Sequence, residues 1–201
     1  MGLMTERVRC RKCALGQGRL TVPPTGVDGK QYLTFVGEAP GANEDQYGKP
    51  FIGKAGNILV ELLEMLDLKR EQVLITNVCK CRPPANRDPY DDEREACIHQ
   101  WLIHELTARG DDGLRLVIPL GKVAMTAFLG ERSIYDAAGR VWSTEYLTGT
   151  LWDRLVPWGA PVLRVYPLLH PASIFRSGEN RKRFWADAGK LKRFLVEKWW
   201  L

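Results

Sequence analysis

The chain alternates short apolar runs with longer amphipathic segments. Four runs rich in Val, Ile, Leu and Phe predict β-strands at 32–37, 73–78, 114–121 and 162–169. Apolar residues at helical spacing predict helices over 56–68 and 91–110, and a last, basic helix from Asn180 onward. Strands separated by helices in this order favour a mostly parallel sheet that helices cover on both faces.

This pattern predicts an α/β fold, a three-layer α/β/α arrangement around a mostly parallel four-stranded sheet. The chain has 201 residues, of which 45% are hydrophobic, which suits one domain over 1–201. An N-terminal arm at 1–30 and a segment at 142–161 fall outside the alternation. We expect the second segment to be a hairpin or loop insertion.

Polar or thiol-bearing segments follow three of the four predicted strands. They read "GEAPGANED", "TNVCKC" and "HPASIFR", whereas the third strand runs through "PLGKVAMTAFLG" into an ordinary helix start. In open α/β sheets, ligands bind at the carboxyl ends of the strands. The sequence therefore predicts one site assembled from three loops that are distant in sequence.

The charge distribution and the lengths of the apolar runs indicate which kinds of partner the protein can bind. The formal net charge is +5, and residues 174–198 carry eight Lys or Arg against three acids. A basic surface of this kind suits a polyanion such as DNA, although a merely solvated surface would look the same. No run approaches the roughly 18 apolar residues of a membrane span, and the charged start lacks a signal-peptide core. We expect a cytoplasmic, nucleoid-associated protein with no membrane contact.

Five cysteines in such a setting make an odd disulfide set and a better metal-binding set. Two of them stand in the strand-end segment "TNVCKC", and a Cys-x2-Cys pair lies near the start of the chain. The alternative is that the thiols are unligated core residues, which the charged neighbours of Cys10 and Cys13 disfavour.

Four motifs carry a resemblance to a known family. "GEAPG" (37–41), "GKPFIGKAG" (48–56), "TNVCKCRPP" (76–84) and "HPASIFR" (170–176) closely resemble those of the family 4, iron–sulfur uracil-DNA glycosylases. The resemblance implies a monofunctional enzyme, expected to be monomeric. It would flip uracil out of single- or double-stranded DNA and hydrolyse its N-glycosidic bond. The abasic site left behind would start base-excision repair.

The resemblance also implies a [4Fe–4S] cluster on Cys10, Cys13, Cys81 and Cys97, with a structural role of tying in the arm. Zinc could take the same four thiolates, although the spacing between Cys81 and Cys97 is unlike that of a zinc finger. Cys79 falls outside the family's pattern. We expect a small apolar strand residue there, but it could compete as a ligand.

Base recognition is assigned to two residues. The Asn77 amide offers one donor and one acceptor, which suit N3–H and O4 of uracil and mismatch cytosine. Phe51 would stack on the flipped base. The plainer readings are a turn-forming Asn at a strand end and an ordinary core aromatic.

The resemblance gives His170 the catalytic role of hydrogen-bonding uracil O2, where charge collects as the glycosidic bond breaks. Glu38 is the candidate carboxylate for the developing sugar cation and the attacking water. Other branches of the superfamily carry Asp at the next position, which is Ala39 here, so the role of Glu38 stays open. It could instead bond backbone amides in a tight loop.

The remaining assignments concern backbone and DNA. The Ala39 amide is the expected second donor to O2, and Gly37 and Gly41 would permit close approach to the substrate. Ile174 would wedge into the gap left by the flipped nucleotide, with Phe175 behind it. The basic side chains expected on phosphates are those of Arg176, Lys54, Arg82 and Arg87.

The sequence is also compatible with two other functional interpretations. One is a non-catalytic uracil-DNA-binding or polymerase-associated iron–sulfur module, for which the missing Asp leaves room. The other is a zinc-containing nucleotide-binding protein of the same fold class.

Overall fold

A computed structural model describes residues 6–26, 33–107, 115–146, 150 and 163–199. Within these residues, the chain forms one five-stranded sheet in the order β2-β1-β3-β5-β4. The strands are β1 (Leu33–Gly37), β2 (Leu74–Asn77), β3 (Arg115–Pro119), β4 (Trp142–Ser143) and β5 (Leu163–Val165).

Four of these strands are the predicted ones, and they run parallel to one another. The predicted count of four strands is wrong by one, because β4 pairs antiparallel with β5 at the edge of the sheet. With two residues, β4 is too short to give a period-2 signal. It stands at the start of the predicted 142–161 insertion, most of which lies outside the described residues.

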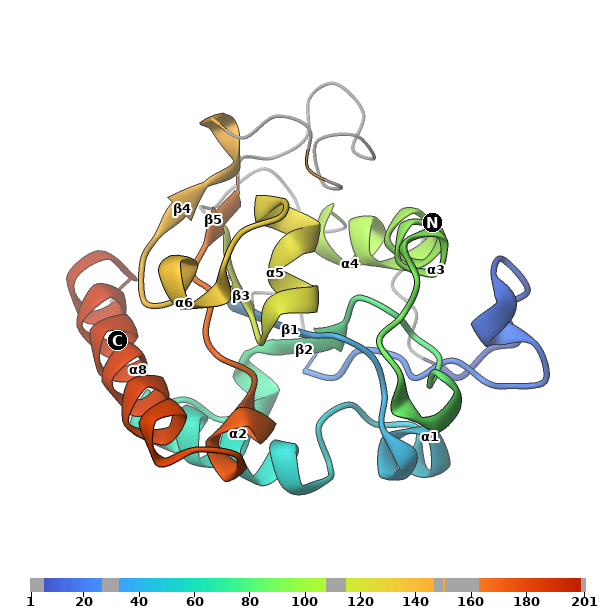
Figure 1. Ribbon diagram of the computed structural model, residues 1–201, viewed down its shortest axis with the longest axis horizontal. Helices are drawn as coiled ribbons and strands as arrows, with labels where there is room; N and C mark the ends of the chain where they lie inside the picture. Colours follow the sequence, from blue (N-terminus) through green and yellow to red (C-terminus); the bar gives the residue numbers. More distant parts are fainter. Residues whose placement is uncertain (1–5, 27–32, 108–114, 147–149, 151–162, 200–201) are drawn as a thin grey trace.

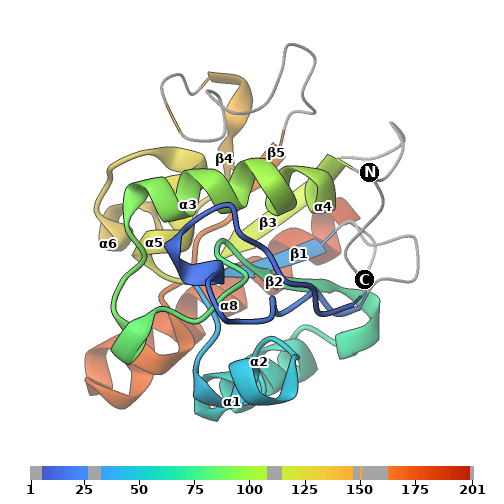
Figure 2. The same ribbon diagram turned by 90° about the vertical axis from the view of Figure 1, so that its right-hand side faces the viewer.

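Helices cover both faces of the sheet, which confirms the three-layer class. Figures 1 and 2 show α2 (Lys54–Met65) and α8 (Gly178–Trp199) on one face. The opposite face carries α3 (Asp91–Cys97), α4 (Ile103–Thr107) and α5 (Lys122–Leu129). Two further short helices are α1 (Ala42–Tyr47) and α6 (Ile134–Ala137). None of the helices in the described part of the chain combines the length and apolar character that crossing a bilayer needs.

Side-chain alternation along the strands creates two cores. Phe35 packs in one cluster with Leu59 of α2 and Phe184 of α8. The next residue of β1, Val36, packs in the other cluster, which includes Phe128 of α5. Successive strand residues point to opposite faces, so a strand buried on both sides is apolar throughout.

The helix predicted at 91–110 is a continuous run of three elements. One turn of π-helix, Ile98–Leu102, joins α3 to α4. Cys97 is the last residue of α3, directly before this turn. Such π-turns are rare and frequently mark functional positions. The predicted stop at Gly110 lies outside the described residues.

The described part of the N-terminal arm runs beside β2. Thr25 forms an antiparallel bridge with Ile75, and the Val22 amide donates to the Lys80 carbonyl over 2.7 Å. These bonds bring the cysteines of the arm to the loop that follows β2.

Candidate active site and cysteine pocket

The backbone brings Glu38 and Asn77 together at the carboxyl edge of the sheet. Gly37 pairs with Asn77 in the parallel register of β1 and β2. Beyond this pair, the Val78 amide donates to the Gly37 carbonyl over 2.8 Å, and the Cys79 amide donates to the Glu38 carbonyl over 2.9 Å. Two loops about forty residues apart in sequence are thereby joined by main-chain hydrogen bonds.

The Asn77 amide and the Phe51 ring meet over Gly37. A Cβ atom placed on Gly37 would lie 2.3 Å from Asn77 Oδ1 and 2.5 Å from Phe51 Cζ, so only glycine fits there. Both side chains are buried, with 4% of Asn77 and 6% of Phe51 exposed. The predicted base-reading amide and base-stacking ring are therefore neighbours.

The backbone at Phe51 is held in a strained conformation by two side chains that the sequence analysis missed. Phe51 has φ +52°, a left-handed value that is uncommon for a non-glycine residue. The Arg70 guanidinium donates to the Phe51 carbonyl over 3.1 Å and to the Pro50 carbonyl. Glu44 Oε1 accepts from the next two amides, at 52 and 53, each over 3.0 Å. Glu44 stands in the segment "GEAPGANED" that follows the first strand, whereas no local pattern marks Arg70.

The His170 ring also lies near Phe51. Their ring centroids are 6.3 Å apart, with an interplanar angle of 31°. His170 caps the short 3-10 helix Pro171–Phe175, because its Nδ1 accepts from the Ala172 amide over 3.1 Å. Burial, together with the nearby charge of Arg176, lowers the pKa of His170 to about 4. The imidazole is therefore neutral near pH 7. With Nδ1 accepting, it carries its proton on Nε2 and can donate from there.

The pKa of the Glu38 carboxyl is shifted upward, in contrast to that of His170. Burial and, to a smaller extent, the charge of Asp88 raise the pKa of Glu38 to about 7, against an opposing effect of Arg94. A carboxyl of this kind can hold or release a proton near neutral pH. Asp88 was not among the predicted site residues, because its proximity to Glu38 arises only from the fold. Glu38, Phe51, Asn77 and His170 are called the strand-end site below.

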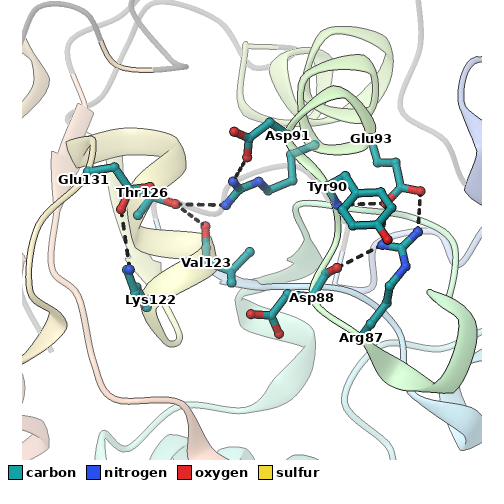
Figure 3. Close-up of polar contacts among 10 residues, drawn as sticks. Arg87, Asp88, Tyr90, Asp91, Glu93, Lys122, Val123, Thr126 and Glu131 are labelled. Carbon is teal, nitrogen blue, oxygen red and sulfur yellow. Dashed lines mark hydrogen bonds and ion pairs between the residues drawn. The ribbon is translucent and has the colours of Figure 1, made fainter.

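The loop between Cys81 and α3 is clamped by Arg87. Figure 3 shows its guanidinium against Glu93 and Tyr90: both amino groups bond the carboxylate over 2.8 Å, and the Tyr90 ring centroid lies 3.7 Å away. Glu93 also accepts from the Tyr90 amide over 2.8 Å at the start of α3. The bond from Arg87 lowers the pKa of Glu93. Arg87, predicted to hold a phosphate, is thus already engaged in the protein.

The residues predicted to contact DNA divide into buried and exposed ones. Ile174, the predicted wedge, belongs to the core and is only 8% exposed. Its neighbour Phe175 is 60% exposed. Arg176 and Lys54 are also exposed, and Arg82 bonds Asn86 Oδ1 through Nε over 2.7 Å.

Of the two remaining predicted positions, Ala39 packs against the core on the α5 face. Gly41 precedes α1, and a Cβ atom there would lie 2.8 Å from a carboxylate oxygen of Glu44. Both therefore stand in the loop that leaves β1, next to Glu38.

All five cysteines line one pocket, which we call the cysteine pocket. It is formed by the arm, the loop after β2 and the end of α3. Cys10, Cys13, Cys79, Cys81, Cys97 and Trp101 contribute to its wall. All five thiols are free of disulfides. The turn after Cys13 is tight, because a Cβ atom on Gly16 would meet the Cys10 carbonyl oxygen at 2.1 Å.

Electrostatics links the thiols to one another. Burial, together with the charges of Cys97, Cys10 and Cys13, raises the pKa of Cys81 to about 12. Cys97 shows the reverse: a hydrogen bond from the Cys79 thiol, with help from Lys80, lowers its pKa. Such thiols become thiolates together only beside a strong positive charge. Across the described ranges, no group of three or more His, Cys, Asp or Glu side chains is arranged to hold a metal ion.

Comparisons with known proteins give one consistent answer. Residues 23–189 match the family model of the uracil DNA glycosylase superfamily. The chain is 34% identical to a type-4 uracil-DNA glycosylase of Archaeoglobus fulgidus, over 98% of the chain and 93% of the relative. It is 36% identical to that of Saccharolobus solfataricus, covering 98% and 88%. It is 33% identical to that of Thermotoga maritima, covering 98% and 96%.

Proposed function

The chain belongs to the uracil-DNA glycosylase superfamily and to its type-4 family, and we propose that its strand-end site hydrolyses the N-glycosidic bond of uracil in DNA. The carrying observation is the contact of the Asn77 amide and the Phe51 ring over Gly37, with the neutral His170 ring 6.3 Å from Phe51. An apolar face, a two-sided amide and an N–H donor are what a flipped pyrimidine needs.

Uracil would be read by its polar edge. The Asn77 side chain would accept from N3–H and donate to O4, while Phe51 supports the ring face. Cytosine presents the opposite polarity at these two atoms, so it would leave buried polar groups unpaired. A mismatch of this kind discriminates far better than a difference in shape.

The chemistry would be a hydrolysis in which N1–C1′ breaks and water oxygen bonds to C1′. Negative charge then collects on uracil, and the Nε2–H of His170 would stabilise it at O2. A neutral donor suffices, because uracil leaves as an anion. Positive charge develops on the sugar, and the ionised Glu38 would stabilise it and orient the water, whose proton ends on the departing base or in solvent. The product would be an abasic site.

DNA binding is supported by the exposed residues beside the site. Phe175 is the exposed apolar side chain of the last motif, so it fits the wedge role better than the buried Ile174. Arg176 and Lys54 would contact phosphates, and Arg82 would do so next to its bond with Asn86. The basic face of α8 extends this surface.

The cysteine pocket would hold a [4Fe–4S] cluster on Cys10, Cys13, Cys81 and Cys97. Two observations support this fit. Four thiols reach one pocket from three segments, and the Trp101 indole N–H, on the same wall, is buried without a partner among the described residues. Cluster sulfur is an acceptor for such donors. When bound, the cluster would supply a structural cross-link and no step of the hydrolysis.

An oligonucleotide with one internal uracil, single-stranded or paired with guanine, tests the activity. After incubation and hot alkali, it should break at the uracil. An intact strand together with a gel shift would instead favour a binding-only module. Asn77→Asp should weaken uracil excision and admit some cytosine excision, whereas Asn86→Asp, on the exposed loop, should leave base preference unchanged. An unchanged preference in Asn77→Asp would remove Asn77 from base reading.

A further inference from the structure

Lys80 lies between Cys79 and Cys81, and its side chain has no part in the function proposed above. The side chain is fully buried, with 0% of it exposed, which is rare for lysine. Its ammonium group makes three hydrogen bonds: to Thr76 Oγ1 over 2.7 Å, to the Asn77 carbonyl over 2.6 Å and to Glu105 Oε2 over 2.8 Å.

We propose that Lys80 is a positioning residue that fixes the backbone of Asn77 for base recognition. This inference rests on the proposed function and adds a residue to its specificity. Of the three bonds from the ammonium group, the one to Asn77 is the shortest. A charged donor makes such a bond roughly twice as strong as a neutral one.

The main chain of Lys80 ties the same residue to the cysteine pocket. Its amide donates to Cys97 Sγ over 3.2 Å, and its carbonyl accepts from the Val22 amide of the arm. One residue therefore contacts a predicted cluster ligand through its backbone and the base-reading residue through its side chain. A shift of the loop after β2 would move Asn77 with it.

The partner of Lys80 comes from the helix that carries Cys97. Glu105 lies in α4, which continues from α3 through the π-turn, and it is 2% exposed. Its Oε2 also accepts from the Thr76 hydroxyl over 2.8 Å. The ion pair therefore fastens this helix to the end of β2.

Stability alone does not explain the pair. Apolar residues of similar volume in place of a buried ion pair are often neutral or stabilising, whereas removing one partner is strongly destabilising. Glu105 Oε1, moreover, has no hydrogen-bond partner among the described residues. A directional role, fixing one carbonyl at the strand end, accounts for a buried charge that packing does not require.

Three variants separate positioning from stability. Lys80→Met alone leaves Glu105 unpaired and should lower Tm strongly. Lys80→Met combined with Glu105→Leu removes both charges and should recover most of that Tm. Glu105→Gln is the matched control, because it keeps the bond from Lys80 to the Asn77 carbonyl.

The readout is single-turnover excision of uracil, per molecule competent to bind an abasic-site oligonucleotide. The double variant should be about 100-fold slower than wild type, the effect of a misplacement of roughly 1 Å. Its Kd for abasic DNA should be unchanged, and Glu105→Gln should stay within about threefold of wild type. In ¹⁵N–¹H spectra, the Asn77 backbone signal should shift in the double variant and stay in the control.

The outcomes distinguish the two proposals. If the wild-type protein does not excise uracil, the proposed glycosylase activity is wrong. The Asn77 backbone signal of the double variant then still tests whether Lys80 positions Asn77. An active wild type with an equally fast double variant overturns the role of Lys80. An unshifted Asn77 signal in the double variant does the same.

Discussion

The strand-end site and the cysteine pocket both take residues from the short segment 76–81 but are built in different ways. At the strand-end site, the sheet register and fixed hydrogen bonds set the positions of Asn77 and Glu38. Its groups are tuned to be useful near neutral pH, with a neutral His170 and a Glu38 of pKa about 7. In the cysteine pocket, loops bring the thiols together: burial and the neighbouring thiols raise the pKa of Cys81, whereas the hydrogen bond from Cys79 lowers that of Cys97.

This difference predicts that variants of the two sites have different effects, one set on the reaction rate and the other on the stability of the protein. The strand-end site is preorganised by the protein alone, so its variants should change rate or base choice and leave the fold intact. In the proposal above, the cysteine pocket is complete only when the cluster is bound, so its variants should change stability and cofactor content. Each prediction below tests one side of this division.

His170 carries the largest expected effect on rate. His170→Ala should slow excision by about 10²–10³-fold, the usual loss on removing a donor to a developing oxyanion. It should also lower the stability by about 1 kcal/mol, because the cap on Ala172 is lost. His170→Asn can keep the cap but lacks the Nε2–H donor, so it should lose the rate and keep Tm. A fully active Asn variant would assign His170 a capping role only.

Cys81→Ser should act on stability. We expect a lower iron content, a bleached absorbance between about 350 and 450 nm, and a Tm lower by several degrees, because the cross-link to the arm is lost. Uracil excision per folded molecule should change by less than tenfold.

Cys79→Ser is the matched control for Cys81→Ser, since Cys79 stands outside the predicted ligand set. It should keep its iron. Wild-type protein that is colourless and contains zinc would contradict the cluster, and iron lost from both variants would put Cys79 among the ligands.

Glu38→Gln sharpens the role of the carboxylate through pH. In wild type, kcat/KM should fall about tenfold per pH unit below pH 7, because protonation removes the charge that stabilises the sugar cation. The Gln variant should lose this slope and be about tenfold slower at pH 8. Asp88→Asn should move the midpoint to lower pH, since the charge of Asp88 raises the pKa of Glu38. A wild-type profile without an acidic limb would exclude Glu38 from this role.

The raised pKa has a second consequence with the opposite pH dependence. Between the ordinary pKa of 4.5 and the folded value of about 7, Glu38 keeps its proton only in the folded state. Stability should therefore fall slightly as pH rises through this window. Thermal unfolding of Glu38→Gln should lack this contribution.

Phe175→Ala should give the smallest effect, several-fold slower excision from double-stranded DNA with Tm unchanged. Ile174→Ala should do the reverse, with a loss of about 2–5 kcal/mol in stability because it empties a core position. Single-stranded substrate is the control, because it has no stacked duplex gap to fill. A loss of rate in Ile174→Ala alone would leave the wedge role with Ile174.

The sequence by itself determined the layered fold and most of the strand-end site. Strands buried on both faces read as apolar runs, and parallel strands place their carboxyl ends at one edge, so "GEAPG" and "TNVCKC" had to meet there. The motifs pointed to Asn77, Phe51 and His170. These features depend on local periodicity and on short, ordered motifs, which a linear sequence carries.

Only the tertiary structure decided which side chains are exposed, paired or held. It placed Ile174 in the core and Phe175 outside, Glu44 and Arg70 around the backbone of Phe51, and Lys80 against Glu105. It also added the edge strand β4 and brought Asp88 to Glu38. Each of these depends on contacts between segments far apart in the chain. The energies of a buried charge and of a strained φ depend on those distant neighbours, so a local sequence pattern cannot predict either feature.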